Sequence, residues 1–529
     1  MKRVLLINPH YPIAETPSPP LGLAYLAGSL GAAGVAVRLL DGVVIPLTKE
    51  RLAAELAAFA PHWVGVTAVT MTVNRALDIV RQVKSCDPGV RTVMGGPHVT
   101  FTAEATLQAV PELDLIVRGE GERTLTALVS ADADGRDWEA IEGLSFRRDG
   151  AIQHTAERLP LADIDRLPPP ARRRGPLGRY RTLGMPVSLT TSRGCPYKCI
   201  FCVGRRMVGA RVRYRQPAAV VDEMAELTRM GFTQINLADD LFTANRRHCL
   251  AVCDEIIARG LHVRWSAFAR VDTVSPETLA RMQAAGCQAV SFGIESGSPE
   301  ILRTVRKGIR RDQAVNAVRM CRAAGIAPLA SFILGRPGET PETLAQTLAF
   351  SAQLEQEGLC YGFHLLAPFP GTEVRARTAD YGLRILSANW DDYHANRAVC
   401  TPAGLDPAEL DALAAKWERR LQVYLEDIRR KMDRGAATPE ERGQILNMER
   451  TVILYELMMG GVLEGLRLQS AGAVTEEDQL RLIARQAAGH LPAYTPEQIA
   501  DALLAADRRQ GLRRIRSNGH EHWEWVDYL

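Results

Sequence analysis

Residues 187–202 of the 529-residue chain are Val187-Ser188-Leu189-Thr190-Thr191-Ser192-Arg193-Gly194-Cys195-Pro196-Tyr197-Lys198-Cys199-Ile200-Phe201-Cys202. The apolar start of this stretch predicts a strand that runs directly into a loop with three cysteines. Five further apolar runs follow, at 234–238, 264–268, 289–294, 329–334 and 362–367, with helical patterns between them. Six such units predict a partial (β/α)6, TIM-like barrel over residues 183–390, with its chemistry at the carboxyl ends of the strands.

The residues before the barrel also alternate between strand and helix patterns. Apolar runs at 4–7, 35–41, 63–67, 91–94 and 115–118 predict five strands. Helical patterns between them indicate right-handed βαβ units, hence a doubly wound parallel sheet over residues 1–135. A ligand of such a sheet lies beyond the carboxyl ends of the strands, where the glycine-rich turns of this segment are found.

Two segments lack this alternation. Residues 136–182 contain a proline run at 168–170 and an arginine triplet at 172–174, and we expect an extended, solvated linker there rather than a nucleic-acid patch. After residue 400 the strand patterns stop. Amphipathic runs at 408–431 and 444–468 predict a helical C-terminal region over residues 391–529.

The composition is typical of a soluble globular protein. The 64 Lys and Arg residues and the 61 Asp and Glu residues leave a net charge of +3, and 46% of the residues are hydrophobic. This composition excludes a disordered chain and a strongly cationic nucleic-acid binder. No apolar run approaches the roughly 18 residues that a membrane span needs. The run at 4–7 is too short for a signal peptide, so we expect a cytoplasmic protein with neither a nucleic-acid nor a membrane partner.

The cysteine loop carries the most specific chemical signal. Three thiolates in eight residues can bind three irons of a cubane iron–sulfur cluster, which ordinarily takes four protein ligands. The open iron could then bind a substrate and pass it one electron. The alternatives are a zinc site, with His248 or Cys249 as the fourth ligand, and unligated cysteines packed in the core.

The segment from Arg193 to Cys202 resembles the signature of the radical S-adenosylmethionine (SAM) enzymes. The first domain resembles the Rossmann-like cobalamin-binding domain that often precedes it. This second resemblance rests on domain order and on the stretches Pro19-Pro20-Leu21-Gly22-Leu23, Gly95-Gly96-Pro97-His98 and Gly119-Glu120-Gly121-Glu122. Over residues 1–390 the chain is therefore similar to the cobalamin-dependent radical SAM family.

The resemblance implies a [4Fe-4S] cluster on Cys195, Cys199 and Cys202. It implies a SAM site formed by Phe201, Asp239, Asp240, Arg270, Glu295 and Gly335. Carboxylates at strand ends can accept hydrogen bonds from the SAM ammonium or ribose, and an arginine can fork onto its carboxylate. The alternative roles are helix caps for the three acids, a rim salt bridge for Arg270 and an ordinary turn at Gly335.

The resemblance also implies a cobalamin site in the first domain. Its expected residues are Thr67, Thr70, Met71, Gly95, Gly96, His98, Gly119, Glu120 and Gly121. One departure from many cobalamin proteins is the missing D-x-H-x-x-G loop, because residues 41–46 are Asp-Gly-Val-Val-Ile-Pro. The implied cofactor is base-off cobalamin without a protein histidine ligand, with Thr70 or Met71 toward its lower face. The alternative is a domain that has lost cobalamin.

The remaining cysteines are mostly expected in the core. Cys249 and Cys253 share one helix face, and Cys287, Cys321 and Cys360 lie in apolar elements. Cys400, in a loop after the barrel, is the best candidate for an additional functional thiol. His364, on the last barrel strand, either faces the barrel cavity or packs in the core.

The function that the resemblance implies is methyl transfer from cobalamin to an unactivated carbon of a small molecule, started by one-electron cleavage of SAM. An external flavodoxin- or ferredoxin-like protein would supply the electron. Within the family, oxidative ring closure, methylation of phosphorus and transfer of the 3-amino-3-carboxypropyl group of SAM stay open. A different class, a cobalamin or cluster sensor without turnover, also stays open.

Overall fold

The computed structural model describes residues 1–11, 17–131, 138–466, 468–469, 475–517 and 520–529. The first sheet has seven strands in the order β2-β1-β3-β4-β5-β6-β7. Its parallel part comprises β1 (Arg3–Asn8), β2 (Ala36–Asp41), β3 (Trp63–Thr67), β4 (Arg91–Gly95) and β5 (Leu115–Val117). These are the five strands that the apolar runs predict.

Helices cover both faces of this sheet. On one face, α1 (Leu21–Ala32) and α6 (Gly121–Ser130) pack through Leu30 and Leu125 against Leu6 and Val93. On the other face lie α2 (Lys49–Phe59), α3 (Val73–Cys86), α4 (Pro97–Phe101) and α5 (Ala103–Ala109). Alternate residues of each strand thus enter different hydrophobic clusters, as a sheet buried on both faces requires.

The segment predicted as a linker contributes to the sheet, so that prediction was wrong in part. Strands β6 (Leu144–Arg148) and β7 (Ala151–His154) form a hairpin that pairs antiparallel with β5. Its turn is Asp149-Gly150, with φ angles of 52° and 78°. Both residues thus have positive φ, which suits an Asp-Gly hairpin turn. Leu144 and Phe146 are buried, so the hairpin covers the β5 edge with apolar side chains.

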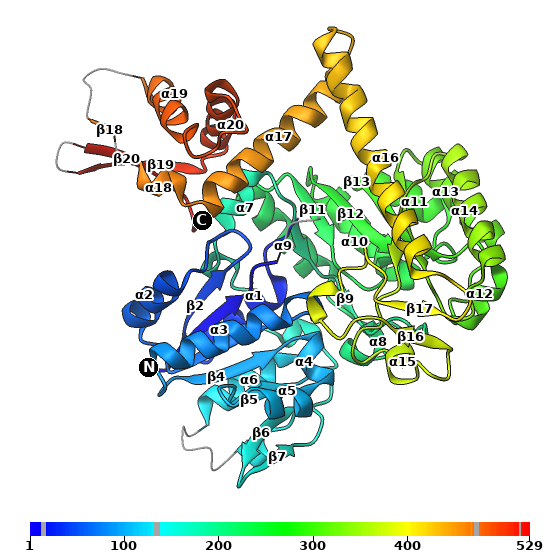
Figure 1. The fold of residues 1–529 in the computed structure, drawn as a ribbon, viewed down its shortest axis with the longest axis horizontal. Helices are drawn as coiled ribbons and strands as arrows, with labels where there is room; N and C mark the ends of the chain where they lie inside the picture. The colour runs from blue at the N-terminus through cyan, green and yellow to red at the C-terminus, as the bar shows by residue number, and fades with distance from the viewer. Residues whose placement is uncertain (12–16, 132–137, 467, 470–474, 518–519) are drawn as a thin grey trace.

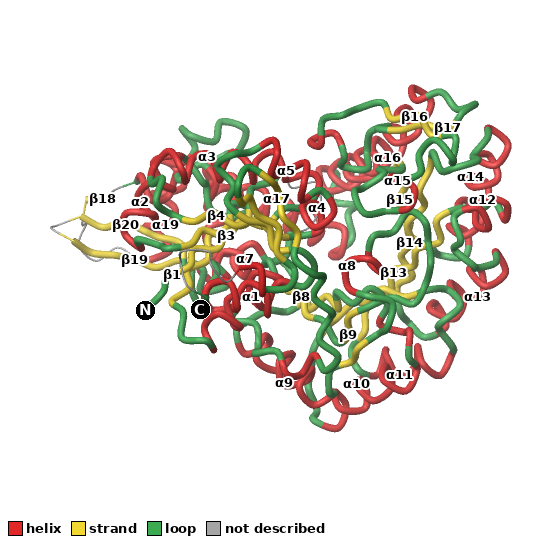
Figure 2. Tube along the Cα trace, turned by 90° about the horizontal axis from the view of Figure 1, so that it is seen from below, coloured by secondary structure: helices red, strands yellow, loops and turns green. Residues whose placement is uncertain are grey.

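The second sheet has six parallel strands in the order β15-β14-β13-β12-β11-β8, as the partial barrel requires. The strands are β8 (Val187–Leu189), β11 (Gln234–Leu237), β12 (Arg264–Ala269), β13 (Cys287–Glu295), β14 (Ala327–Leu334) and β15 (Cys360–Leu365). The sheet curves, and α9 (Pro217–Arg229), α10 (Arg246–Ala258), α11 (Pro276–Ala284), α13 (Arg311–Ala323) and α14 (Pro341–Gln356) lie outside it (Figure 2). The carboxyl ends of its strands face the first domain.

The loop after β2 joins the two domains. Val43, Val44 and Ile45 are at most 1% exposed and belong to the same hydrophobic cluster as the barrel strands. The side chain of Asp41 accepts hydrogen bonds from Tyr180 Oη on α7 (Leu177–Leu183) at 2.7 Å and from Asn8 Nδ2 at 2.9 Å. The domains therefore share one core at this point.

The C-terminal region begins with α16 (Pro407–Asp433) and α17 (Pro439–Met459), which project from the body as a helical hairpin (Figure 1). Helices α19 (Glu476–Ala487) and α20 (Pro496–Arg508) follow. The expectation of helices alone was wrong, because β18 (Leu468–Gln469), β19 (Leu512–Ser517) and β20 (His520–Trp525) form a small sheet and β17 (Cys400–Pro402) pairs with β16 (Leu383–Ile385). In β20, buried Trp523 and Trp525 alternate with polar residues, a two-residue period that fits a strand. Among the described helices, none is long and apolar enough to cross a membrane.

Candidate functional site

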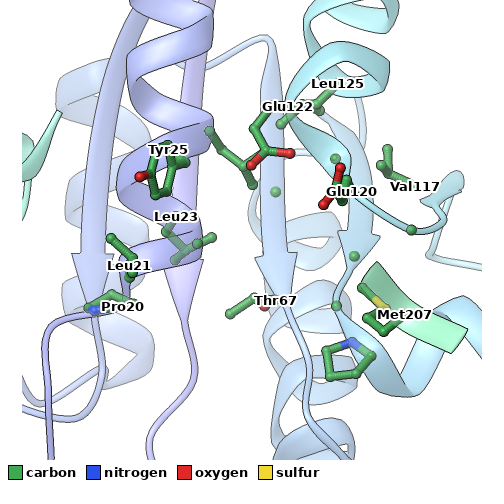
Figure 3. A pocket seen from close by; sticks show the side chains of 18 of the residues that line it. Pro20, Leu21, Leu23, Tyr25, Thr67, Val117, Glu120, Glu122, Leu125 and Met207 are labelled. Atoms are coloured by element: carbon green, nitrogen blue, oxygen red, sulfur yellow. The ribbon is translucent and has the colours of Figure 1, made fainter. Parts of the chain in front are cut away.

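A cavity of about 540 Å³ lies between the two domains, beyond the carboxyl ends of β1, β3, β4 and β5. This volume is within the roughly 300–1,000 Å³ range of small-molecule sites. Figure 3 shows Pro20, Leu21, Leu23 and Tyr25, at the start of α1, on one side of the cavity, and Glu120, Glu122, Leu125 and Met207 on the other. Met207 belongs to α8 (Gly204–Val208), the helix that follows the cysteine loop.

The inner part of this cavity is an apolar slot between the sheet and helices α1 and α6. Leu6, Leu26, Val93 and Leu125 line it. Gly65 lies at the same depth, and a Cβ atom there would come within 2.9 Å of Leu6 Cδ2. A side chain at position 65 would therefore compete with Leu6 for space at the base of the slot.

Six of the nine residues expected to hold cobalamin line the cavity, namely Thr67, Gly95, Gly96, Gly119, Glu120 and Gly121. They lie at the ends of β3, β4 and β5, where small residues let a flat ligand approach the backbone. Gly96 has a φ of 104°, and a Cβ atom there would lie 2.6 Å from the carbonyl oxygen of Ala68. The close turn at this position requires glycine.

Thr70, Met71 and His98 do not line the cavity. His98 is buried, its Nδ1 lies 3.2 Å from Thr70 Oγ1, and its ring meets that of Trp390 edge-on at 4.8 Å. Burial, with a contribution from Arg375, lowers the pKa of His98 to about 4. Through its contacts with Thr70 and Trp390, His98 packs the first domain against the segment after the barrel.

Sequence reasoning missed an ionic network in the cavity wall. Arg193 Nη1 lies 2.8 Å from Glu122 Oε1 and 3.5 Å from Glu120 Oε1, and its guanidinium lies 4.8 Å from the centre of the Tyr25 ring. Arg213 forms two hydrogen bonds to Glu120, of 2.9 and 2.6 Å. The Arg193 side chain begins two residues before the cysteines, so the network ties the cysteine loop to the cavity. Its members are too far apart in the chain for spacing to reveal them.

The cysteine loop follows β8 and β9 (Ser192–Arg193) at the carboxyl rim of the barrel. The backbone N–H of Gly204 donates to Cys202 Sγ at 3.4 Å. Cys202 retains contact with solvent, yet the surrounding protein raises the pKa of its thiol to about 11, and burial also raises the pKa of Cys195. Three sulfur donors on one loop suit a cluster of iron, which prefers soft thiolate ligands.

The fourth ligands that the zinc alternative needs are engaged elsewhere. His248 Nε2 hydrogen-bonds Thr191 Oγ1 at 3.0 Å, and Cys249 is fully buried in the barrel core. The donor chemistry of the loop therefore fits the cluster better than zinc.

Asp239 and Asp240 are adjacent but do different things. Asp239 is buried and accepts three hydrogen bonds of 2.6 Å, from Thr191 N, Thr191 Oγ1 and Ser192 Oγ. Its carboxylate holds the start of the cysteine loop and is not directed at the cavity. Asp240 lines the cavity and accepts a 3.3 Å hydrogen bond from Gly194 N.

Asp240 also shows how close the cavity is to the cysteines. A Cβ atom on Gly204 would lie 2.9 Å from Asp240 Oδ1 and 3.5 Å from Cys202 Sγ. The Asp240 carboxylate, in the cavity wall, is therefore close to the third cysteine. A ligand in the cavity and a cluster on the loop would be neighbours.

The other expected SAM residues form two arrangements beside the loop. Arg270 makes two 2.9 Å hydrogen bonds to Asp272 and lies 3.6 Å from the centre of the Tyr197 ring. The structure thus shows the rim salt bridge at Arg270. Its guanidinium clamps the aromatic ring that lies between Cys195 and Cys199.

Glu295 is buried between two cations. It accepts hydrogen bonds from Lys307 Nζ at 2.9 Å and from Arg336 Nη2 at 2.6 Å. Burial would raise the pKa of Glu295, but Lys307 and Arg336 outweigh it and hold the pKa below its ordinary value. Arg336 in turn lies 4.1 Å from the centre of the Phe201 ring.

The turn after β14 supplies unsatisfied polar atoms. Gly335, with a φ of 78°, donates its N–H to Glu339 Oε2 at 2.5 Å. Within the described residues, Arg336 Nη1 and Glu339 Oε1 are buried without a hydrogen-bond partner. Buried polar atoms of this kind ordinarily have partners, so the region beside Phe201 fits a polar ligand.

The other candidate thiols have structural surroundings. Cys400 is buried, its Sγ lies 3.3 Å from the carbonyl oxygen of Leu366, and burial raises its pKa to about 12. Cys249, Cys253, Cys287 and Cys321 are buried as expected, whereas Cys360 is exposed at the start of β15, where the core packing expected for it was wrong. His364 is only partly buried, on β15.

Comparison with known proteins agrees with this site. Residues 14–129 match the B12 binding domain and residues 189–351 match the Radical SAM superfamily. An uncharacterized methyltransferase of Pyrococcus horikoshii is 36% identical over 384 residues, which are 72% of this chain and 83% of that protein. An anaerobic magnesium-protoporphyrin IX monomethyl ester cyclase of Rubrivivax gelatinosus is 30% identical over 437 residues, 79% of this chain and 77% of that protein.

The fold is shared with a solved member of the same group. The structure of the radical SAM methyltransferase TsrM from Kitasatospora setae, with cobalamin and a [4Fe-4S] cluster bound, has a TM-score of 0.65 at 22% identity. The match covers 96% of this chain and 99% of that one. With both domains, their order and the cysteine loop in place, the chain belongs to the cobalamin-dependent radical SAM enzymes.

Proposed function

We propose that this enzyme transfers a methyl group to an unactivated carbon of a small organic molecule. The observation that carries the proposal is the position of Asp240, which lies in the wall of the 540 Å³ cavity and beside Cys202. A methyl carrier in the cavity and a radical source on the loop would thus serve one reaction space. The methyltransferase of Pyrococcus horikoshii supports the choice of reaction.

The residues of the chain divide the work between two sites. Cys195, Cys199 and Cys202 would hold the cluster, and the unsatisfied atoms of Arg336 and Glu339 would meet polar groups of SAM beside Phe201. The carboxylate of Asp240 would accept a hydrogen bond from the ammonium group of SAM. Asp239, Arg270 and Glu295 would act indirectly, by holding the cysteine loop, Tyr197 and Arg336 in place.

When bound, the cluster would supply the electron that cleaves SAM into methionine and a 5′-deoxyadenosyl radical, and the cobalamin would carry the methyl group of a second SAM. The first-domain residues would exclude water from this chemistry, because the slot and the mouth are lined mainly by apolar side chains. We propose an external flavodoxin- or ferredoxin-like donor for the electron, and a cytoplasmic location in which such donors occur.

We propose that the cobalamin is bound base-off, with its nucleotide tail in the slot between α1 and α6. Two observations support this geometry. The slot is lined by apolar side chains, and no side chain projects into it from Gly65. The loop that carries a histidine in many cobalamin proteins is here Val43-Val44-Ile45, buried in the shared core of the two domains.

Oxidative ring closure is the second candidate reaction. It is favoured by the 30% identity with the Rubrivivax gelatinosus cyclase. The products separate the reactions. Methylation gives 5′-deoxyadenosine and S-adenosylhomocysteine together, ring closure gives 5′-deoxyadenosine without S-adenosylhomocysteine, and transfer of the aminocarboxypropyl group gives 5′-methylthioadenosine.

The test is anaerobic reconstitution with iron, sulfide and cobalamin, followed by reduction and mass analysis of the SAM products. We expect a cubane absorption spectrum and both methylation products in the native enzyme, and neither in Cys199→Ala. Cys360→Ala, which removes an exposed cysteine outside the loop, is the matched control and should behave like the native enzyme. Zinc bound to the three cysteines of the purified protein, or SAM cleavage by the Cys199→Ala variant, would contradict the proposal.

A further inference from the structure

A second cavity, of about 350 Å³, adjoins the site described above. Its walls come from Phe101 at the end of α4, Arg206 on α8, Trp390, and residues 370–372 and 375–376 after the last barrel strand. Helices α4 and α8 also border the first cavity, through Pro97 and Met207. The two cavities therefore share these two helices as walls.

The second cavity is also joined to the cysteine loop. Val374 N donates to the carbonyl oxygen of Ile200, inside the loop, at 3.1 Å. Arg206 Nη1 donates to the carbonyl oxygen of Gly371 at 2.9 Å. A molecule in this cavity would thus lie beside both proposed cofactor positions, where a substrate has to be.

The charge of the cavity is unbalanced. Arg206 and Arg375 line it, whereas no Asp or Glu does. Across the described part of the chain, neither guanidinium forms an ion pair, and Arg375 Nη1 instead bonds Tyr393 Oη at 3.0 Å. By contrast, Arg193, Arg213 and Arg336 are all paired with carboxylates. Two unpaired arginines in one concave site favour an anionic ligand.

Aromatic rings complete the walls. The Trp390 ring lies 5.0 Å from the Arg375 guanidinium and is itself packed against His98 and Tyr393. The centre of the Phe101 ring lies 5.8 Å from the guanidinium of Arg206. The same ring packs so closely on Gly371 that a Cβ atom on Gly371 would clash with the ring. Held rings of this kind suit the apolar part of an organic ligand.

We infer that this cavity binds the anionic group of the substrate, a carboxylate or a phosphate, between Arg206 and Arg375, with the apolar part of the substrate against Phe101 and Trp390. The inference rests on the proposed function for the identity of the ligand as substrate. The binding itself requires only residues of this chain.

Calorimetric titration of the reconstituted holoenzyme tests it, with benzoate, phenyl phosphate and the neutral benzamide as probes. We expect the anions to bind about tenfold or more tighter than benzamide, because charge-assisted hydrogen bonds to arginine are stronger than neutral ones. The preferred anion identifies the group. Arg206→Gln and Arg375→Gln should each lower the affinity for the anion by about tenfold. Arg375→Lys should lower this affinity less, because lysine keeps the positive charge.

Arg377→Gln is the matched control. This exposed arginine is close to Arg375 in the chain but pairs with Asp380 outside the cavity, so its loss should leave anion affinity unchanged. Equal binding of benzoate and benzamide, or equal affinity in Arg206→Gln, Arg375→Gln and the native enzyme, would overturn the inference. SAM cleavage in the same preparation separates the two proposals. Cleavage without anion binding refutes only the anion site, and anion binding without cleavage refutes only the proposed function.

Discussion

The guanidinium of Arg193 lies 2.8 Å from the carboxylate of Glu122, which joins the start of the cysteine loop to the wall of the central cavity. Both side chains are largely buried, at 14% and 9% exposure. The pair is therefore one of the contacts that join the two proposed cofactor positions, together with the ion pairs of Glu120. Its loss should affect both domains.

Arg193→Gln should lower the free energy of unfolding by about 3–5 kcal/mol, because it leaves the Glu122 charge buried without its partner. The same variant should retain less cobalamin after gel filtration. Chemical denaturation and the visible spectrum measure the two effects. Arg310→Gln removes an exposed ion pair with Asp312 and serves as the control. It should change the free energy of unfolding and the amount of retained cobalamin much less.

Gly65→Ala should weaken cobalamin binding by about 1–3 kcal/mol, since the added methyl group would crowd the side chain of Leu6, its partner on β1, at the base of the slot. Equilibrium dialysis with cobalamin measures the change in dissociation constant. Gly31→Ala, in α1 where a Cβ atom meets nothing within 4 Å, is the control and should bind normally. Unchanged affinity in Gly65→Ala would place the nucleotide tail outside this slot.

Asp239→Asn and Asp240→Asn should separate two roles, namely holding the cysteine loop in place and binding SAM. Asp239→Asn should cost about 1–3 kcal/mol of stability, because an amide cannot accept all three of the hydrogen bonds that the carboxylate accepts. Asp240→Asn should keep its melting temperature but bind SAM about tenfold more weakly. Thermal melting measures the stability of both variants, and SAM titration measures their affinity for SAM. A loss of affinity confined to Asp239→Asn, with a loss of stability confined to Asp240→Asn, would contradict these roles.

His98 should make the stability of the first domain depend on pH. Its pKa is about 4 in the folded chain, mainly because of burial, against an ordinary value of 6.5. Between these values the unfolded chain binds a proton that the folded chain does not, so stability should fall as the pH falls from 6.5 to 4. The loss attributable to His98 should reach about 3 kcal/mol at pH 4.

His98→Asn should therefore flatten the pH dependence of unfolding in that window, measured by denaturation at a series of pH values. His262→Asn, at an exposed histidine, serves as the control and should keep the native slope. Arg375→Gln should move the midpoint of the His98 contribution upward, because Arg375 helps to lower this pKa. An unchanged slope in His98→Asn would show that His98 does not contribute.

Some of what sequence reasoning missed had a local signal. Asp149-Gly150 between alternating residues is a hairpin pattern, and the proline and arginine runs nearby obscured it. Other features had no such signal. Asp239 and Asp240 are adjacent in the sequence and both follow β11, so only the path of the chain after that strand determines which one reaches the cavity.

The local chemistry of the chain was enough to establish both α/β domains, their order, the three-thiol loop and most of the glycine turns around the central cavity. These features depend on residue spacing and backbone conformation, which neighbouring residues determine. The tertiary structure alone showed that Arg193 meets Glu122, that His98 packs against Trp390, and that two arginines without a carboxylate partner among the described residues share a second cavity. Such pairings join residues far apart in the chain, and they arise only when the packing of two domains brings their side chains within contact distance.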